Sequence, residues 1–266
     1  SWKSQCDADG YLTLTIGHTI EYALAEGNMT FFESNNIRKY ADYLIGISDN
    51  RGRAAGFGDS SLHTTNRIPL SGVPYAFWYT QDPHYLGYLN TISGGEWLNP
   101  YHQGVEPFPP QDHLGVRAYL LDRQVYEYTS HRPYYNEPSG PPNIPFEQAF
   151  DKIAFRAGPG ETDQYFLLDG YARGKHYHYD GNAILKLTHG GEDWLIDADY
   201  LVRNTTEHTM VSVVKNGRIE APIPECAGLL YLADLPSFGF TETVVRGYNG
   251  VDWYRDIFWK KGDWIV

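Results

Sequence analysis

The sequence lacks several features that would each place it in a particular class of protein. No apolar run approaches the roughly 18 residues that a membrane-spanning helix needs. The 33 acidic residues outnumber the 21 lysines and arginines, giving a net charge of −12, and no basic stripe could neutralise nucleic-acid phosphates. There are only two cysteines, Cys6 and Cys226, far apart in the chain. We therefore expect no membrane span and no nucleic-acid partner. Whether the two cysteines form a disulfide stays an open question.

The composition is that of a globular protein rich in aromatic residues. Hydrophobic residues make up 42% of the 266 positions, enough for one large domain or two smaller ones. Aromatic residues reach 15%, with 22 tyrosines and 7 tryptophans. Such side chains stack on sugar rings, and they equally well fill the core and surface of a β-rich protein. The composition alone leaves both interpretations open.

The first third of the sequence has helical periodicity. Residues 11–26 carry apolar side chains at helical spacing before Gly27. A second helix is predicted at residues 35–47, and its inward stripe consists of Ile37, Tyr40, Ala41, Leu44 and Ile45. Shorter helices are expected at residues 73–80, 84–92 and 114–121. Residues 1–128 are therefore predicted to be a helical region.

The second half is predicted to be an antiparallel β domain. Residues 129–149 form a connector, since this segment is rich in proline, glycine and polar residues. From residue 150 to residue 266, short β-type runs separated by Gly and Asn turns predict a sandwich-like sheet. The strands are expected at residues 152–156, 164–168, 182–187, 194–197, 209–214, 229–233, 242–248 and 253–259.

One stretch of the β domain concentrates possible metal ligands. His176, His178 and Asp180 are two residues apart and would share one face of a strand. Pairing with the next two strands would bring Asp197 and His208 to the same face. Two or three histidines with a carboxylate are a typical divalent-metal site. Each residue alone also has a plain structural interpretation, as a strand end or a polar turn residue.

The ordered set of these motifs resembles the β-sheet signature of the heparinase II/III-like polysaccharide lyases and the related uronyl C5-epimerases. The matching stretches are Lys152-Ile-Ala-Phe-Arg156, Leu167-Leu-Asp-Gly-Tyr171, His176-x-His178-x-Asp180-x-Asn182, Trp194-Leu-Ile-Asp197, His208-Thr-Met-Val211 and the run from Trp253 to Trp264. The resemblance implies an α+β fold, in which the C-terminal part of an (α/α) toroid precedes an antiparallel β-sandwich-like domain.

The resemblance also implies roles for individual residues of the β domain. It makes His176 catalytic and makes His178, Asp197 and His208 the ligands of a divalent metal, namely Zn²⁺, that holds strands and loops in place. Tyr200 matches a catalytic tyrosine position of the epimerase branch, and its plain interpretation is a strand-end aromatic. Arg173 and Asn182 are expected to contact the substrate.

On the helical side, Asp9-Gly10 and Phe57-Gly-Asp59-Ser60 resemble recurring landmarks of the toroid. The family places a catalytic tyrosine on the helix after the first landmark, and that position falls here near His18. Either His18 replaces the tyrosine as base, or the register differs and the tyrosine is Tyr11 or Tyr22. Tyr22 and Asp59 are also expected to bind substrate.

The function implied is a polysaccharide lyase that cleaves an anionic, uronate-containing polysaccharide by β-elimination. Three alternatives remain: a uronyl C5-epimerase, a cupin-type metal enzyme, and a non-catalytic carbohydrate-binding module. The first residues show no signal peptide and the last ones read as the middle of a strand, so we expect a partial or processed chain. A secreted or periplasmic protein is the expected setting.

Overall fold

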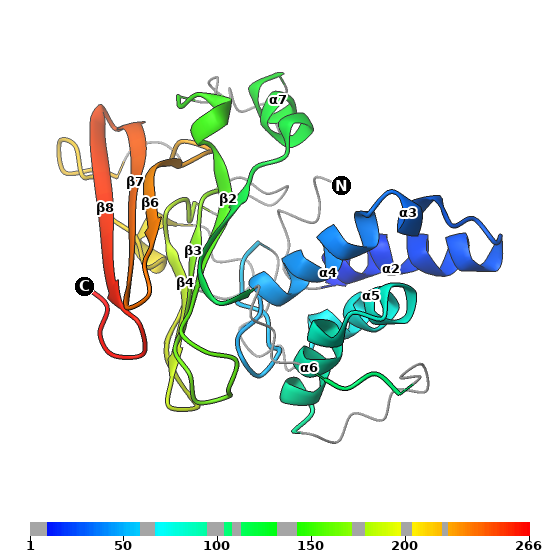
Figure 1. Cartoon of the computed structure of the whole chain (residues 1–266). Helices are drawn as coiled ribbons and strands as arrows, with labels where there is room; N and C mark the ends of the chain where they lie inside the picture. The colour runs from blue at the N-terminus through cyan, green and yellow to red at the C-terminus, as the bar shows by residue number, and fades with distance from the viewer. Residues whose placement is uncertain are drawn as a thin grey trace.

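The computed structural model describes residues 10–58, 67–94, 104–107, 113–131, 143–171, 179–197, 204–219 and 223–266. Within these residues, the helices α2 to α6 lie on one side of a five-stranded sheet, and a three-stranded sheet lies on its other side (Figure 1). Helix α7 (Arg123–His131) lies at the top of that view, beyond the upper end of β2. The chain therefore has a mixed architecture of helices and antiparallel sheets.

The helical region follows the predicted periodicity closely. Its elements are α2 (Gly10–Ala25), α3 (Thr30–Glu33), α4 (Asn36–Gly46), the 3₁₀ turn η1 (Ile68–Ser71), α5 (Val73–Thr80) and α6 (Pro83–Ile92). The predicted inward stripe of α4 is confirmed, since all five of its residues are buried. Asp82 caps α6 by accepting the His84 backbone N–H at 3.0 Å, and Pro83 occupies the first helical position.

Two antiparallel sheets make up the β region. The first has the order β1 (Gly115–Leu120), β2 (Phe150–Arg156), β3 (Tyr165–Asp169), β4 (Ile184–His189) and β5 (Glu192–Ile196). The second consists of β6 (Gly228–Asp234), β7 (Phe238–Tyr248) and β8 (Val251–Lys260). The short 3₁₀ turns η3 (Phe146–Gln148) and η4 (Thr205–Glu207) lie between strands.

The strands β2 and β3 of the five-stranded sheet are covered on both faces. Every residue of these two strands is buried. Alternate residues such as Ala154 and Leu167 pack into the core shared with the helices. Their neighbours Phe155 and Phe166 pack against Trp259 of the other sheet, with ring centroids of Phe155 and Trp259 5.6 Å apart.

Two expected elements are wrong. Residues 114–121 form the strand β1 instead of a helix, because the segment pairs with β2 from Gly115 to Leu120; a short apolar run does not by itself distinguish the two. Residues 209–214 form no strand. Side chains anchor that segment instead: the Thr209 N–H donates to Asp197 at 2.8 Å, and Asn249 donates to the Val213 carbonyl at 2.9 Å.

The boundaries of the helical region, connector and β domain stay predictions, and so does the (α/α) toroid.

None of the described helices is both long enough and apolar enough to cross a membrane. Cys226 is a buried free thiol, and Cys6 lies outside the described residues.

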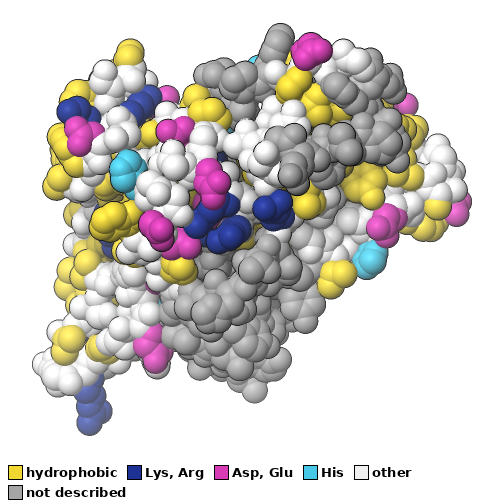
Figure 2. Space-filling view, turned by 90° about the horizontal axis from the view of Figure 1, so that it is seen from below, with side chains coloured by type: hydrophobic (Ala, Val, Ile, Leu, Met, Phe, Trp, Pro, Cys, Tyr) yellow, Lys and Arg dark blue, Asp and Glu magenta, His cyan; other side chains and the backbone are white. Residues whose placement is uncertain are grey.

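Ion pairs join the turn after α4 to the sheet. Asp49 pairs with Arg51 at 3.0 Å and with Lys186 of β4 at 2.8 Å, and Arg51 also pairs with Asp193 of β5. The view from below shows lysine and arginine side chains gathered in the middle of this face, with carboxylates beside them (Figure 2). The cations in the middle of this face thus lie next to acidic side chains.

The buried Arg156 of β2 connects the sheet to the end of α4 through several hydrogen bonds. The Arg156 guanidinium donates to the carbonyls of Ile45 at 2.9 Å and Ser48 at 2.6 Å, and also to the Asn50 side chain. It lies 4.7 Å from the centre of the Tyr165 ring, whose hydroxyl donates to the Gly46 carbonyl at 2.9 Å. The C-terminal carbonyls of α4, which have no partner within the helix, are therefore satisfied by β2 and β3.

We expect Arg156→Ala to lower the free energy of unfolding by about 3 kcal/mol or more, because it leaves several buried acceptors without donors. Urea unfolding followed by circular dichroism measures this change. Arg246→Ala is the matched control: Arg246 pairs with Asp252 at the exposed surface, and its removal should leave the unfolding midpoint unchanged. Equal effects of the two substitutions would contradict the role assigned to Arg156.

Candidate functional site

Three buried side chains converge at the edge of the sheet where β3 ends, β4 begins and β5 ends. Asp180, Asp197 and His208 each offer one possible ligand atom, and these atoms lie within 4.8 Å of one another. His208 Nδ1 lies 2.8 Å from Asp197 Oδ2. The three residues come from separate segments of the chain, so the fold alone creates this cluster.

Turns at the strand ends hold the three side chains. Asp180 lies in the turn before β4, where the Ala183 N–H donates to the Asp180 carbonyl at 2.7 Å. Asp197 directly follows β5, and its N–H donates to the Leu185 carbonyl at 2.9 Å. His208 follows η4, whose capping box is formed by Asn204 and Glu207.

The hydrogen bonds of the cluster leave one carboxylate incompletely satisfied. Asp197 accepts from the Thr209 N–H through Oδ1 and lies against His208 through Oδ2. Asp180 Oδ1 is buried and has no hydrogen-bond partner among the described residues. Burial, together with the negative charge of Asp197, raises the pKa of Asp180 above its usual range although His208 opposes this. Burial would lower the pKa of His208, but the hydrogen bond that its ring donates to Asp197 and the nearby carboxylates raise it above its usual range.

A second buried group lies next to this cluster. Lys152 Nζ lies 2.9 Å from the carboxylates of both Asp151 and Asp169, and all three side chains are at most 2% exposed. The Tyr43 hydroxyl of α4 donates to Asp151 at 2.8 Å, and the Lys152 ammonium lies 4.2 Å from the centre of the Phe57 ring. The two carboxylates raise the pKa of Lys152 against its burial, so the lysine stays charged. Burial and the nearby charge of Asp180 raise the pKa of Asp169.

Counting charges gives an excess of carboxylates in this region. Asp151, Asp169, Asp180 and Asp197 are all buried, whereas Lys152 and His208 are the buried groups beside them that can carry positive charge among the described residues. A buried carboxylate without a partner is costly unless it is protonated or a cation neutralises it. The unsatisfied oxygen of Asp180 and the mixed oxygen and nitrogen donors fit a divalent cation such as Zn²⁺.

The structure brings together some of the sequence-predicted residues and not others. Of the expected metal ligands, Asp197 and His208 meet, although the strand expected after His208 does not form. Asp180, expected only to share their face, lies with them as a third possible ligand. The predicted residues that lie outside the described part of the chain are Asp59, Arg173, His176, His178 and Tyr200.

The remaining predicted residues lie away from the cluster or beneath the surface. His18 is exposed on α2 and lies 3.2 Å from Glu21, and Tyr22 is 68% exposed on the same helix. Asn182 is fully buried, and its side chain accepts from the Thr243 hydroxyl at 2.8 Å. With a φ of 66°, Asn182 shapes the turn that holds Asp180.

Sequence reasoning missed the network around Lys152. The signal was present, since β2 contains the charged pair Asp151-Lys152, and charges in a strand covered on both faces must be compensated. Tyr43 is 108 residues away from Asp151 in the sequence, and Asp169 is 17 residues away from Lys152. No spacing rule connects positions so far apart.

A large cleft opens near this network. It has a volume of about 1,040 Å³ and lies between α2 and α4 on one side and residues 120–123 on the other. Tyr43 lines it and also bonds to Asp151, so the wall of the cleft connects to the buried network. Lys39 and Arg123 supply positive charge to its lining. The cleft is large enough for several sugar units.

Solved structures share this architecture. The crystal structure of heparinase III is similar over 96% of this chain, with a TM-score of 0.66 and 15% sequence identity. That of the heparan sulfate lyase HepC from Pedobacter heparinus is similar over 96%, with a TM-score of 0.60 and 12% identity. The chain spans 38% and 35% of the lengths of these two proteins. No protein-family model and no curated protein sequence matches the chain. The similarity therefore establishes a polysaccharide lyase-like fold.

We expect Asp180→Asn to weaken zinc binding by about 100-fold or more, because it removes a charged ligand from the cluster. Competition with a chromogenic chelator measures the affinity. The matched control is Asp256→Asn, which removes an exposed carboxylate of β8 and should leave the affinity unchanged. Unchanged affinity in Asp180→Asn would rule this residue out as a ligand.

We expect Asn182→Ala to destabilise the protein by about 2 kcal/mol, because alanine is strained at positive φ and cannot bond to Thr243. Asn182→Gly tolerates the same backbone conformation and should lose about half as much. Urea unfolding of both variants tests this order. If glycine were as costly as alanine, the backbone conformation would not be the reason.

Proposed function

We propose that this chain is part of an enzyme that cleaves a uronate-containing polysaccharide by β-elimination. The observation that carries the proposal is the fold similarity to heparinase III over 96% of the chain. The buried Asp180–Asp197–His208 cluster and the adjacent cleft support it. The anionic polysaccharide is the proposed partner, and a secreted or periplasmic setting follows from a substrate of that kind.

The reaction sets the chemical requirements. A base removes the proton on C5 of the uronate, the bond between C4 and the bridging oxygen breaks, and a C4–C5 double bond forms beside the carboxylate. The leaving oxygen takes up a proton. The proton on C5 is weakly acidic, so the enzyme must neutralise the carboxylate and place a base close to it. Histidine and tyrosine suit these roles, and we assign them to His176 and Tyr200.

Two cations of the cleft support binding of an anionic polymer, although Asp122 also lines it and Arg123 lies 3.6 Å from Glu127. The protein carries a net charge of −12, which repels a polyanion at long range. Lys39 of α4 is exposed, and Arg123 at the start of α7 lies on the other wall of the cleft. We propose that these two cations hold the carboxylates of the bound chain. The modest number of cations favours a substrate without dense sulfation.

The proposed metal has a supporting part in this function. Asp180, Asp197 and His208, together with the sequence-predicted His178, would hold Zn²⁺. When bound, the cation neutralises the excess of buried carboxylates and fixes the turns at the strand ends. The residues themselves position the segments on either side of the cluster, since Asp197 orients His208 and binds the Thr209 backbone.

The test is an ultraviolet assay for unsaturated uronide, run on the full-length protein with a panel of uronate polysaccharides. We expect product from the wild type and a loss of about 1,000-fold or more in His176→Ala, because the proton transfer then lacks its catalytic group. The matched control is His189→Ala, which removes a histidine at the opposite end of β4 from Asp180 and should retain activity.

Other outcomes would decide against elimination. If no polysaccharide yields product, solvent deuterium in the uncleaved polymer would identify a C5-epimerase. Binding without cleavage or exchange would identify a carbohydrate-binding protein. Full activity in His176→Ala would remove this residue from the catalytic step.

A further inference from the structure

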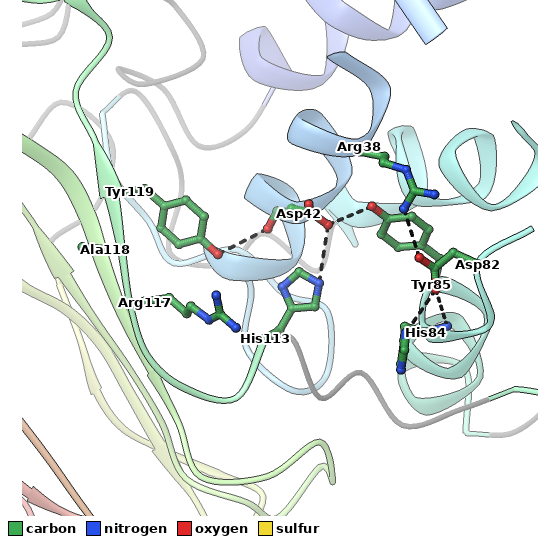
Figure 3. A pocket seen from close by; sticks show the side chains of 9 residues that line it. All are labelled: Arg38, Asp42, Asp82, His84, Tyr85, His113, Arg117, Ala118 and Tyr119. Atoms are coloured by element: carbon green, nitrogen blue, oxygen red, sulfur yellow. Dashed lines mark hydrogen bonds and ion pairs between the residues drawn. The ribbon is translucent and has the colours of Figure 1, made fainter. Parts of the chain in front are cut away.

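A second, smaller pocket lies between α4, the start of α6 and the edge strand β1. Its volume is about 250 Å³, below the roughly 300–1,000 Å³ typical of sites for drug-sized ligands, so it suits one small molecule or sugar unit. It shares no lining residue with the cleft or with the Asp180–Asp197–His208 cluster. The side chains that line it are Arg38, Asp42, Asp82, His84, Tyr85, His113, Arg117, Ala118 and Tyr119 (Figure 3).

Both carboxylates of this pocket are already held by the protein. Asp42 Oδ1 accepts from the Tyr85 hydroxyl at 2.9 Å and lies 3.6 Å from His113 Nε2. Asp82 pairs with Arg38 at 3.0 Å and caps α6. The side chain of Asp42 is 47% exposed and that of Asp82 is 25% exposed. Each therefore has room to accept a further hydrogen bond from a ligand.

Arg117 is the charge of this pocket that remains without a counterpart. Its guanidinium makes no hydrogen bond or ion pair with any described residue, and Figure 3 shows it turned toward His113 and Asp42. Antiparallel pairing of Arg117 with Ala154 fixes its backbone on β1. Burial, with the charges of Arg156 and Arg117, lowers the pKa of His113 to about 3, so this ring is neutral near pH 7. A guanidinium offers paired donors that match a carboxylate.

We propose that this pocket binds a sugar acid: Arg117 holds the carboxylate, and Asp42 and Asp82 accept hydrogen bonds from hydroxyl groups. The two carboxylates decide the ligand class. Sulfate has no hydrogen to donate and would meet Asp42 and Asp82 as like charges. A neutral sugar would leave Arg117 without its partner. The proposal concerns binding alone and does not depend on the elimination reaction.

The test is isothermal titration of the full-length protein with D-glucuronate, which has no glycosidic bond to cleave. We expect saturable binding. The affinity should fall about tenfold or more in Arg117→Gln, because this variant loses a charged bidentate contact. Arg246→Gln removes an exposed arginine of the other sheet and should bind as the wild type does. Glucose should bind at least about tenfold more weakly than glucuronate, and sulfate should not displace it.

A second variant separates loss of binding from loss of folding. Asp42→Asn removes one of the two like charges that oppose sulfate and leaves Asp82, which is paired with Arg38. Sulfate should now compete with glucuronate, a gain that an unfolded protein cannot show. The proposal is overturned if the wild type does not bind glucuronate or if Arg117→Gln binds it as tightly as the wild type. Displacement of glucuronate by sulfate from the wild type would also overturn it, by showing a general anion site.

Discussion

Lys152 is the buried charge on which the arrangement of helices, sheet and candidate site depends. Its ammonium lies between Asp151 and Asp169 inside the protein, where an unpaired charge would be costly. Tyr43 brings α4 to the same group through Asp151, and Phe57 packs over the ammonium. The position of the helices against β2 and β3 is thus coupled to the ionic state of this group.

The same group sets the electrostatics of the Asp180–Asp197–His208 cluster. Asp169 is shared between Lys152 and the turn at Tyr171, whose N–H donates to it at 3.0 Å. Lys152 and His208 are fewer than the four buried carboxylates around them, and Asp180 Oδ1 has no hydrogen-bond partner among the described residues. The divalent cation proposed for this place would neutralise part of that negative charge.

The fold separates two kinds of binding surface. The large cleft lies beside the buried network and exposes Lys39 and Arg123, which suits an extended anionic chain. The pocket around Arg117 is smaller and combines two carboxylates with a guanidinium that has no partner among the described residues, the arrangement proposed here for a single acidic sugar. Both lie where the helices meet β1 or the residues that follow it, because the edge of a sheet leaves room that a central strand would fill.

Elements that depend on local periodicity could be predicted before the structure was known. The stripe of α4 and the short run of β3 are visible in the sequence as apolar patterns. Residues 114–121 contain a strand because they pair with β2, and a short apolar run does not by itself distinguish a strand from a helix. Asp180, Asp197 and His208 could be placed on one face from their residue types and spacing, whereas Lys152 beneath them and Arg117 in its pocket emerged only from the tertiary structure. Local patterns fix which face of an element is apolar; only the packed chain fixes which distant charges must share one low-dielectric space.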